Sequence, residues 1–201
     1  IKSSAASDVY KRQDDDYADD IMVSVFNEYK DYITGRPTTR GGVYHVDMLP
    51  TTCHVYFGDV MIATPNGRLA HNPLSEGISP EKGADINGPT AVVKSCSKMN
   101  HCETGGTLLN QKFTPAAIAG EKGIDNLAAL IRSYFAMNGH HMQFNVIDRQ
   151  TLIEAQKNPE EYKELIVRVA GYSDYFRNLD KPLQNEIIER TEQSFGGCGC
   201  C

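Results

Sequence analysis

The stretch Arg168-Val169-Ala170-Gly171-Tyr172-Ser173 closes an apolar, β-branched run that begins at Leu165. Short runs of this kind are typical of buried strands, so the sequence predicts a strand over residues 165–170. A lone glycine then interrupts the run directly before an aromatic residue. An isolated glycine in a strand pattern usually marks only a turn or a strand end. The combination of Arg, a small residue, Gly and Tyr is more specific, and the prediction of function starts from it.

Composition bounds the class of protein. The chain has 201 residues and a formal net charge of −6, a length that allows one ordinary domain with its own core. The negative charge argues against a surface for nucleic acid or for anionic membranes. No apolar run is long enough to span a bilayer, and no signal peptide is readable. The sequence therefore predicts a cytoplasmic protein with neither a membrane nor a nucleic-acid partner.

Both ends of the chain look foreign to the rest. Residues 1–17 include a stretch, 3–13, without amphipathic period, and we expect them to be a non-native assembly artefact. Residues 196–201 crowd three of the six cysteines into six positions and are expected to be a non-native tail; a metal or disulfide role is the alternative. One domain is predicted over residues 18–195. Its three other cysteines form no disulfide framework, which fits a reducing compartment.

Hydrophobic periodicity predicts alternating helices and strands. Helices are expected over residues 21–33 with a cap at Asp19-Asp20, over 92–99, from a cap at Asp125 through 135, over 151–157 and over 180–188. Strands are expected over residues 43–49, 53–62, 108–113, 142–147 and 165–170. Residues 71–90 are rich in Pro, Gly, Ser and Asn and are predicted to form a long loop, which in a compact domain is usually functional or disordered. The alternation predicts an α/β fold.

Six further segments carry a family resemblance. They are Thr64-Pro65-Asn66-Gly67-Arg68, Pro73-Leu74-Ser75-Glu76-Gly77, Asn87-Gly88-Pro89-Thr90-Ala91, Gly105-Gly106-Thr107-Leu108-Leu109-Asn110, Gln143-Phe144-Asn145-Val146 and Ile187-Ile188-Glu189-Arg190-Thr191. With the stretch around Gly171, their order and spacing resemble the C-terminal region of the glycyl radical enzymes, the pyruvate formate-lyase-like family. The residues of these segments are most similar to those of the branch that dehydrates trans-4-hydroxy-L-proline, glycerol or propanediol.

The resemblance implies a fold and a role for the glycine. The fold is the C-terminal part of a ten-stranded α/β barrel, in whose centre a glycine loop meets a cysteine loop. The role of Gly171 is radical storage on its α-carbon. Such a radical is stabilised when the carbon is planar and conjugates with the flanking amide nitrogen and carbonyl, and a Cβ would crowd that state. Glycine also reaches backbone angles that suit a tight loop. Arg168 and Tyr172 are expected to hold the loop rather than to do chemistry.

The chain lacks the thiol that would use such a radical. In the family this cysteine stands far upstream, in a Gly-Cys-x-Glu-like loop whose glutamate is the general base, and no such motif occurs here. Cys102-Glu103 lack the glycine and the spacing, so we expect Cys102 to be structural or exposed. Cys53 is expected to be a small buried apolar residue. The chain is therefore expected to be a fragment of a longer enzyme and inactive alone.

By resemblance, Thr51 and Arg190 are the candidate substrate-binding residues. Thr51 would donate a hydrogen bond to a substrate carboxylate or hydroxyl; the alternative is a turn threonine that satisfies its own backbone. Arg190 falls where dehydratases of the family place an arginine near the active site; the alternative is a solvated or helix-capping cation. His140 and His141 are adjacent, which favours a loop or core role over metal binding. No metal site is predicted.

The resemblance predicts an anaerobic glycyl radical dehydratase or lyase that eliminates water from a small hydroxylated substrate, with trans-4-hydroxy-L-proline first and a 1,2-diol next. It implies no bound cofactor, a homodimer at full length, and a partner activating enzyme that installs the radical with S-adenosylmethionine. One alternative is a formate C-acetyltransferase (pyruvate formate-lyase), which Asp174 disfavours because many members have a small residue there. Another is a spare-part module that docks onto a damaged enzyme and replaces its glycine loop.

Overall fold

A computed structural model describes residues 14–64 and 66–195 of the chain. The predicted non-native segments at residues 1–13 and 196–201 lie outside the described residues. Residues 14–17, which the sequence assigned to the first of these segments, belong to the folded part. Asp15 caps the first helix by accepting a hydrogen bond from the peptide nitrogen of Ala18 at 3.1 Å, and Asp14 N donates to Ser95 Oγ at 2.9 Å.

That first helix, α2 (Asp16–Ile33), begins before the predicted cap at Asp19-Asp20, so the prediction of the cap is wrong. Asp19 is fully buried. Its carboxylate accepts hydrogen bonds from Ser95 Oγ, on α4 (Pro89–Ser97), and from Lys98 Nζ, both at 2.7 Å. The acidic run therefore supplies a helix cap and, one turn later, a tether between two helices.

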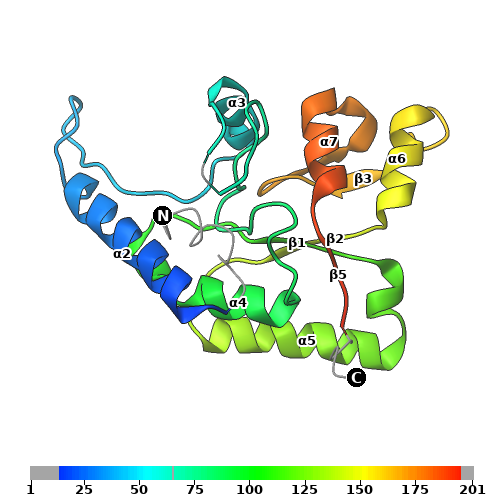
Figure 1. Cartoon of the computed structure of the whole chain (residues 1–201), viewed down its shortest axis with the longest axis horizontal. Helices are drawn as coiled ribbons and strands as arrows, with labels where there is room; N and C mark the ends of the chain where they lie inside the picture. Colours follow the sequence, from blue (N-terminus) through cyan, green and yellow to red (C-terminus); the bar gives the residue numbers. More distant parts are fainter. Residues whose placement is uncertain (1–13, 65, 196–201) are drawn as a thin grey trace.

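The other elements follow in the order shown in Figure 1. The further helices are α3 (Cys53–Val60), α5 (Gly120–Ala136), α6 (Arg149–Lys157) and α7 (Lys181–Glu189), with short 3-10 helices η1 (His101–Glu103), η2 (Pro115–Ile118) and η3 (Phe176–Asn178). The strands are β1 (Asn110–Phe113), β2 (Gln143–Val146), β3 (Ile166–Arg168), β4 (Ser173–Tyr175) and β5 (Glu192–Gln193). The predicted loop from residue 71 ends where α4 begins.

Three of the strands form a parallel sheet in the order β2-β1-β5. Asn110 on β1 stands in register with Gln143 on β2, and Lys112 with Asn145. The connection from β1 to β2 runs through η2 and α5, as a crossover between parallel strands requires. β3 and β4 form a separate antiparallel hairpin with Gly171 in its turn. The predicted α/β fold is confirmed.

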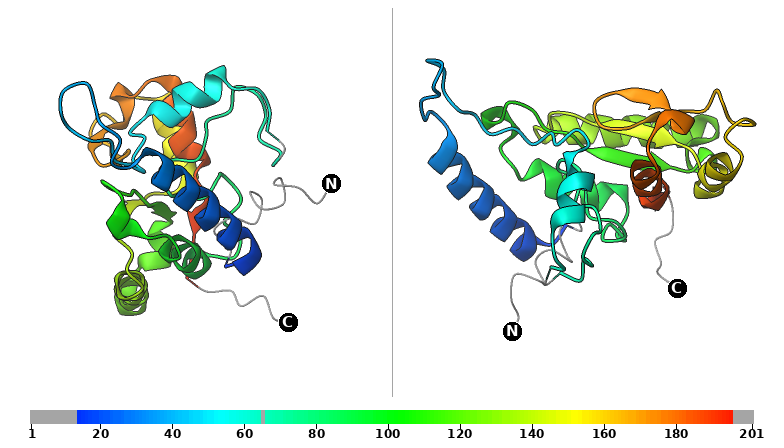
Figure 2. Two further views of the ribbon diagram at one scale, coloured as in Figure 1. Left: turned by 90° about the vertical axis from the view of Figure 1, so that its left-hand side faces the viewer. Right: turned by 90° about the horizontal axis from the view of Figure 1, so that it is seen from above.

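Helices cover both faces of the parallel sheet, as Figure 1 and Figure 2 show. On one face lie α4 and α5, and the buried cluster there includes Val92, Cys96, Phe113, Leu130 and Tyr134. On the other face lie α6, α7 and the β3–β4 hairpin, whose cluster includes Leu152, Val167, Val169, Leu183 and Ile187. The glycine turn is therefore attached to the sheet on the face opposite α5.

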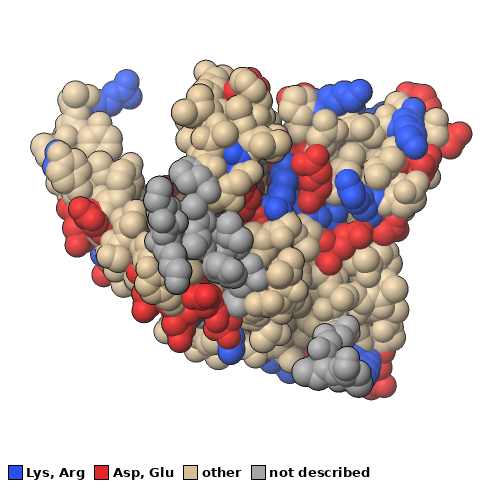
Figure 3. All heavy atoms as spheres, in the orientation of Figure 1, with Lys and Arg blue, Asp and Glu red and all other residues tan. Residues whose placement is uncertain are grey.

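The outer helices present a mixed surface. α2 and the loop after it project away from the body in the right-hand view of Figure 2. Lys and Arg side chains alternate with Asp and Glu between α3 and α7 in Figure 3, so this side has no single-sign charged face. Large apolar side chains are exposed on or beside α2 and α3, among them Tyr29, Tyr32, Tyr56, Val60 and Ile62. Within the described residues, no helix combines the length and the apolar character needed to cross a membrane.

Two predicted strands are wrong. Residues 53–60 form α3, in which the buried residues are His54 and Gly58, one helical turn apart. The backbone of Asn72 and Pro73 lies directly against Gly58, so the contact requires a residue without a Cβ. Residues 43–49 have only isolated bridges, such as that of Met48 with Thr107. The β-branched and aromatic composition of these segments favours strands. In residues 53–60, packing of Gly58 against residues 72–73 selects a helix instead.

The predicted cap at Asp125 is also wrong, because α5 begins at Gly120. Gly120 has a φ of +69°, and Gly123 packs against the backbone of Ile118, so the helix begins tightly folded over η2. The buried face of α5 includes Leu130 and Tyr134. Phe135, near the end of this helix, is exposed. The other predicted helices and strands are confirmed within a few residues. Thr114 caps η2 by accepting a hydrogen bond from Ala117 N.

Candidate active site

Gly171 occupies the turn between β3 and β4 with a φ of +79°. This is the left-handed region of backbone space, which glycine reaches without strain and side-chain-bearing residues rarely adopt. A Cβ built at this position would meet only Leu108 Cδ1, at 3.8 Å, an ordinary contact. The requirement for glycine in this structure therefore comes from the backbone angle and not from lack of space. The turn is closed by a hydrogen bond from Val169 N to the carbonyl of Tyr172 at 2.8 Å.

Both polar groups of Gly171 are hydrogen-bonded by side chains. Its amide nitrogen donates to Gln143 Oε1 at 3.2 Å, and its carbonyl accepts from Arg168 Nη2 at 3.1 Å. Arg168 Nε also donates to Gln143 Oε1, at 2.9 Å, so the same amide oxygen connects both sides of the turn. The nitrogen and the carbonyl that flank the α-carbon are thus held while the α-carbon itself lies in an exposed residue.

A polar row on β1 and β2 holds the strand that leads to the turn. Side chains alternate between the faces of a strand, so Asn110 and Lys112 share a face with Gln143 and Asn145. Asn145 acts like a neighbouring strand: its Nδ2 donates to the carbonyl of Arg168 at 2.7 Å, and its Oδ1 accepts from Arg168 N at 2.8 Å. The backbone of β3 therefore pairs with β4 on one edge and with a side chain on the other.

The carbonyl of Val169, two residues before the glycine, accepts from several donors. Asn110 Nδ2 lies at 3.0 Å and Gln143 Nε2 at 3.3 Å. Arg190 Nη1 and Nη2 lie at 3.2 and 3.3 Å. A carbonyl oxygen has two lone pairs, so these donors share it. The residue is buried, and the donors satisfy a carbonyl that would otherwise destabilise the fold.

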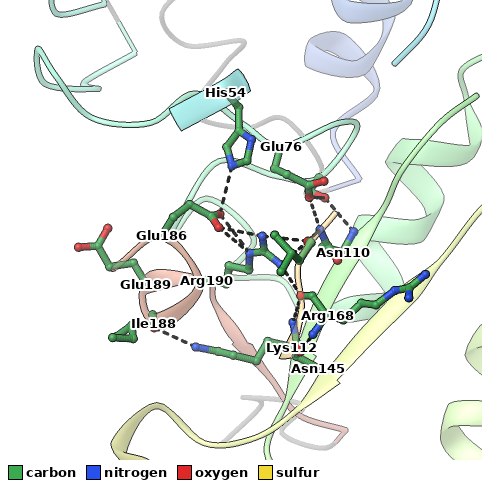
Figure 4. A network of polar contacts seen from close by, with 12 residues as sticks. His54, Glu76, Asn110, Lys112, Asn145, Arg168, Glu186, Ile188, Glu189 and Arg190 are labelled. Carbon is green, nitrogen blue, oxygen red and sulfur yellow. Dashed lines mark hydrogen bonds and ion pairs between the residues drawn. The ribbon is translucent and has the colours of Figure 1, made fainter. Parts of the chain in front are cut away.

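Arg190 belongs to a buried ion pair at the end of α7, drawn in Figure 4. Its Nη2 lies 2.8 Å from Glu186 Oε2, and His54 Nε2 lies 3.8 Å from Glu186 Oε1. Burial would raise the pKa of Glu186, but the guanidinium of Arg190 and the nearby imidazole of His54 overcome it and lower the pKa to about 2. The alternative of a solvated Arg190 is wrong, because its side chain is 9% exposed.

Glu76 is a second buried carboxyl, contributed by the long loop before α4. Its Oε2 accepts from Asn110 Nδ2 and from Ser79 Oγ, the latter at 3.1 Å. Burial raises its pKa to about 7, against the opposing effect of Arg190. Lys112 is buried as well, which lowers its pKa to about 8, and its Nζ donates to the carbonyl of Ile188 at 3.0 Å near the end of α7.

The site contains residues that reading of the sequence missed. Glu76, Asn110, Gln143 and Asn145 all lie in segments quoted for the family resemblance, but they received no role, and neither did Glu186. A signal was present on β2, where polar Gln143 and Asn145 alternate with apolar Phe144 and Val146. That period predicts a polar face on a sheet. The sequence did not show which segment packs against that polar face.

The predicted substrate residue Thr51 stands in the turn before α3, exposed, with a φ of +57°. That region is uncommon for a β-branched residue and indicates a locally strained turn. Its neighbour Thr52 and Tyr172 of the glycine turn line the same groove between α3 and α7, of about 770 Å³. Burial raises the pKa of the Tyr172 phenol there. The turn at 49–52 and the glycine turn thus face one groove, while Arg190 lies buried beside it.

The cysteines differ from expectation at one position. Cys53 is exposed, so its predicted burial is wrong: it begins α3, whose buried face is that of His54. Cys102 is exposed, one of the two outcomes expected, and Cys96 is buried. Of the adjacent histidines, His141 is partly buried, which lowers its pKa with help from Arg168. Over residues 14–64 and 66–195, no three His, Cys, Asp or Glu side chains gather as a metal site would require.

The fold and the site define an α/β domain that presents one glycine α-carbon on a turn whose backbone is held by side-chain amides and arginines. The family description "Glycine radical" matches residues 74–177, and "Pyruvate formate lyase-like" matches residues 13–58. The chain belongs to the glycyl radical family, and the predicted family is confirmed.

Comparison with individual proteins agrees with this assignment. The chain is 68% identical over 182 residues to trans-4-hydroxy-L-proline dehydratase of Clostridioides difficile. The matched region covers 90% of this chain and 23% of that protein. It is similar to the crystal structure of that organism's hydroxyproline dehydratase with bound trans-4-hydroxy-L-proline, with a TM-score of 0.88, 67% identity and coverage of 91% and 23%. It also resembles the glycerol-bound B12-independent glycerol dehydratase of Clostridium butyricum, at 47% identity, a TM-score of 0.88 and the same coverage.

These matches confirm the predicted fold as part of the glycyl radical enzyme α/β barrel. The chain spans about a quarter of the length of these relatives, 23% in each case. The matching region includes the glycine turn and the sheet that holds it.

Proposed function

We propose that this chain is the radical-bearing part of a dehydratase that eliminates water from trans-4-hydroxy-L-proline. The observation that supports it most is the pair of hydrogen bonds to the Gly171 amide and carbonyl in a chain 68% identical to a trans-4-hydroxy-L-proline dehydratase. This identity favours dehydration over the formate C-acetyltransferase and the repair module. A 1,2-diol is the second substrate class, because glycerol dehydratase is 47% identical.

Gly171 is the proposed site of the stored radical. Loss of one hydrogen atom from its α-carbon leaves an unpaired electron that spreads over the flanking amide nitrogen and carbonyl only if all three groups are coplanar. Gln143 and Arg168 hold that nitrogen and carbonyl, and Tyr172 closes the turn through its own carbonyl. These residues are proposed to hold the loop. They restrict rotation about the bonds of the α-carbon and so control how far the two flanking peptide planes can turn toward coplanarity.

The proposal requires partners. An S-adenosylmethionine-dependent activating enzyme would remove the hydrogen atom from Gly171. A thiol from another part of the enzyme would exchange a hydrogen atom with it. We also propose that the full-length enzyme binds no other cofactor, forms a homodimer and is located in the cytoplasm.

Thr51 is the proposed donor to the substrate, because its turn borders the groove that Tyr172 also lines. Arg190 is the second candidate. Its guanidinium already donates to Glu186 and to the Val169 carbonyl, so its contribution to substrate binding is proposed to be mainly the positive charge.

The test uses the full-length enzyme that contains this chain, activated anaerobically and studied by electron paramagnetic resonance. A doublet that is lost in Gly171→Ala supports the radical site. Gly35→Ala is the matched control, since Gly35 also has a positive φ, +82°, and open space around its α-carbon. Turnover of trans-4-hydroxy-L-proline, glycerol and propanediol is then compared, and Thr51→Val is expected to raise KM more than it lowers kcat. A doublet that persists in Gly171→Ala contradicts the radical site, and exclusive turnover of a diol contradicts the substrate.

A further inference from the structure

A chain of hydrogen bonds joins the buried carboxyl of Glu76 to the amide of Gly171. Asn110 Nδ2 donates to Glu76 Oε2, and Gln143 Nε2 donates to Asn110 Oδ1. Gln143 Oε1 then accepts from Gly171 N at 3.2 Å. Glu76, Asn110 and Gln143 are each less than 10% exposed, and the residues come from a loop, β1 and β2. Figure 4 shows Glu76 directed toward Asn110 from the side of His54.

The groups at the two ends fix the direction of this chain. Glu76 as a carboxylate and the Val169 carbonyl only accept, so the NH2 group of Asn110 must face them. Its oxygen must then face the NH2 group of Gln143, whose own oxygen faces two groups that only donate, Gly171 N and Arg168 Nε. One orientation of each amide satisfies every bond. The buried acceptor at position 76 and the donors at Gly171 therefore require the same orientation of Gln143.

We propose that Glu76, Asn110 and Gln143 form a positioning relay that fixes the peptide plane of Gly171 from a buried acceptor at position 76. This inference rests on the proposed role of Gly171 and deepens it, because the orientation of that plane governs how far the unpaired electron spreads. Glu76 and Asn110 do not touch the α-carbon. They act through Gln143, which makes all three positioning residues.

Burial gives the relay its importance. Inside the fold, water cannot replace a missing acceptor, so loss of one link leaves a buried NH2 group with the Val169 carbonyl as its remaining acceptor and one N–H without a partner. Ser79 holds the start of the relay, since its Oγ donates to Glu76 Oε2 and accepts from Asn110 N at 2.9 Å. Glu76 Oε1 has no hydrogen-bond partner among the described residues, so Oε2 alone carries the link.

The test measures hydrogen exchange of the Gly171 amide in the unactivated full-length enzyme. Glu76→Leu removes the acceptor and is expected to speed that exchange about 5- to 10-fold, the effect of one hydrogen bond. Glu76→Gln retains a carbonyl oxygen for Asn110 and is expected to stay within about 2-fold of the parent. Glu189→Leu removes an exposed carboxylate from α7 and serves as the matched control.

Amides of α5 report on global folding, because α5 lies on the opposite face of the sheet. If Glu76→Leu also speeds exchange there, Gln143→Met repeats the test at the last link, with the same expected increase at Gly171. Parental exchange at Gly171 in a folded Glu76→Leu or Gln143→Met enzyme would overturn the relay, and so would failure of Glu76→Gln to preserve it. After activation, a several-fold smaller doublet in Glu76→Leu supports the link to the radical. Absence of any doublet in the parent refutes the proposed function alone, since the exchange measurement needs no radical.

Discussion

On one face of the parallel sheet, Phe113 and Phe144 pack with ring centroids 5.9 Å apart beneath α4 and α5. On the other face, Asn110, Gln143 and Asn145 of the same two strands make hydrogen bonds to the glycine hairpin. Packing on the apolar face depends on the volume and shape of the side chains, and apolar contacts require no particular direction. The polar face needs donors and acceptors in fixed directions. The comparison indicates that the sheet stabilises the domain with one face and positions the glycine turn with the other.

The largest loss of stability is expected on the apolar face. Phe113→Ala removes a fully buried ring that also stacks on Phe195, with centroids 4.9 Å apart. It should destabilise the domain by about 4 kcal/mol through lost burial and a cavity. Hydrogen exchange of amides on α5 and on both strands should accelerate together. Phe113→Leu, which fills most of the volume, is the control. An effect confined to the glycine hairpin would contradict the assignment of stability to this face.

On the polar face, the largest effect is expected at the ion pair. Glu186→Leu leaves the guanidinium of Arg190 buried without its partner and should cost about 3 kcal/mol. The double variant Glu186→Leu/Arg190→Met removes both charges and should recover a large part of that loss. Exchange of amides on α7 and on β3 measures the opening. Equal losses in the single and double variants would show that the charge pair is not the cause.

The polar face should also be the pH-sensitive one. The pKa of Glu76 is about 7 in the folded site against an ordinary value of 4.5, because burial and the nearby carboxylate of Glu186 raise it more than Arg190 lowers it. Its contribution to the closed state is therefore fully present below pH 4.5 and is lost as the pH rises through 7. Local opening of residues 73–80 should increase up to about 100-fold over this range, after correction for intrinsic exchange.

Glu76→Gln should remove most of that pH dependence. Glu186, with a pKa of about 2, contributes its full stabilisation above its ordinary value of 4.5 and loses it only as the pH falls below that value, so it adds no pH dependence in this window. Amides on α5 serve as the internal reference. The same pH dependence in Glu76→Gln would assign it to another group.

The smallest effect is expected at Asn145, whose side chain pairs with the backbone of Arg168. Asn145→Leu should cost about 1 to 2 kcal/mol, because two buried backbone groups lose their partners. The loss should appear as faster exchange at Arg168 N and leave the apolar face unchanged. Asn185→Leu, at an exposed position of α7, is the control. A change spread evenly over both faces would show that they are not separable.

Much of the fold could be predicted from local pattern. The strands β1, β2 and β3 were predicted within a few residues, β3 because its run is short and apolar, and α6 and α7 because their apolar residues recur at helical spacing. α3 was not, since its aromatic and β-branched residues favour a strand, whereas contact of Gly58 with residues 72–73 selects a helix. Cys53 was predicted to be buried because free cysteines usually are, but it is exposed at the start of α3. A local pattern does not show which distant segment packs against a helix, such as residues 72–73 against Gly58 of α3.

The candidate site divides in the same way. Gly171, Arg168 and Tyr172 are adjacent in sequence, so a single motif identified them. Glu76 stands 95 positions before Gly171 in the sequence, and no local pattern connects the two.

The residue pattern was enough to predict that a glycine follows a buried strand at position 171, and the order of several segments was enough to predict the glycyl radical family. The strand pattern and the freedom of glycine at a φ of +79° are properties of a few neighbouring residues. What holds the glycine depends on tertiary contacts. Hydrogen bonds depend on direction as well as on residue type, and the register of β1 against β2 aligns Asn110 with Gln143 beneath the turn.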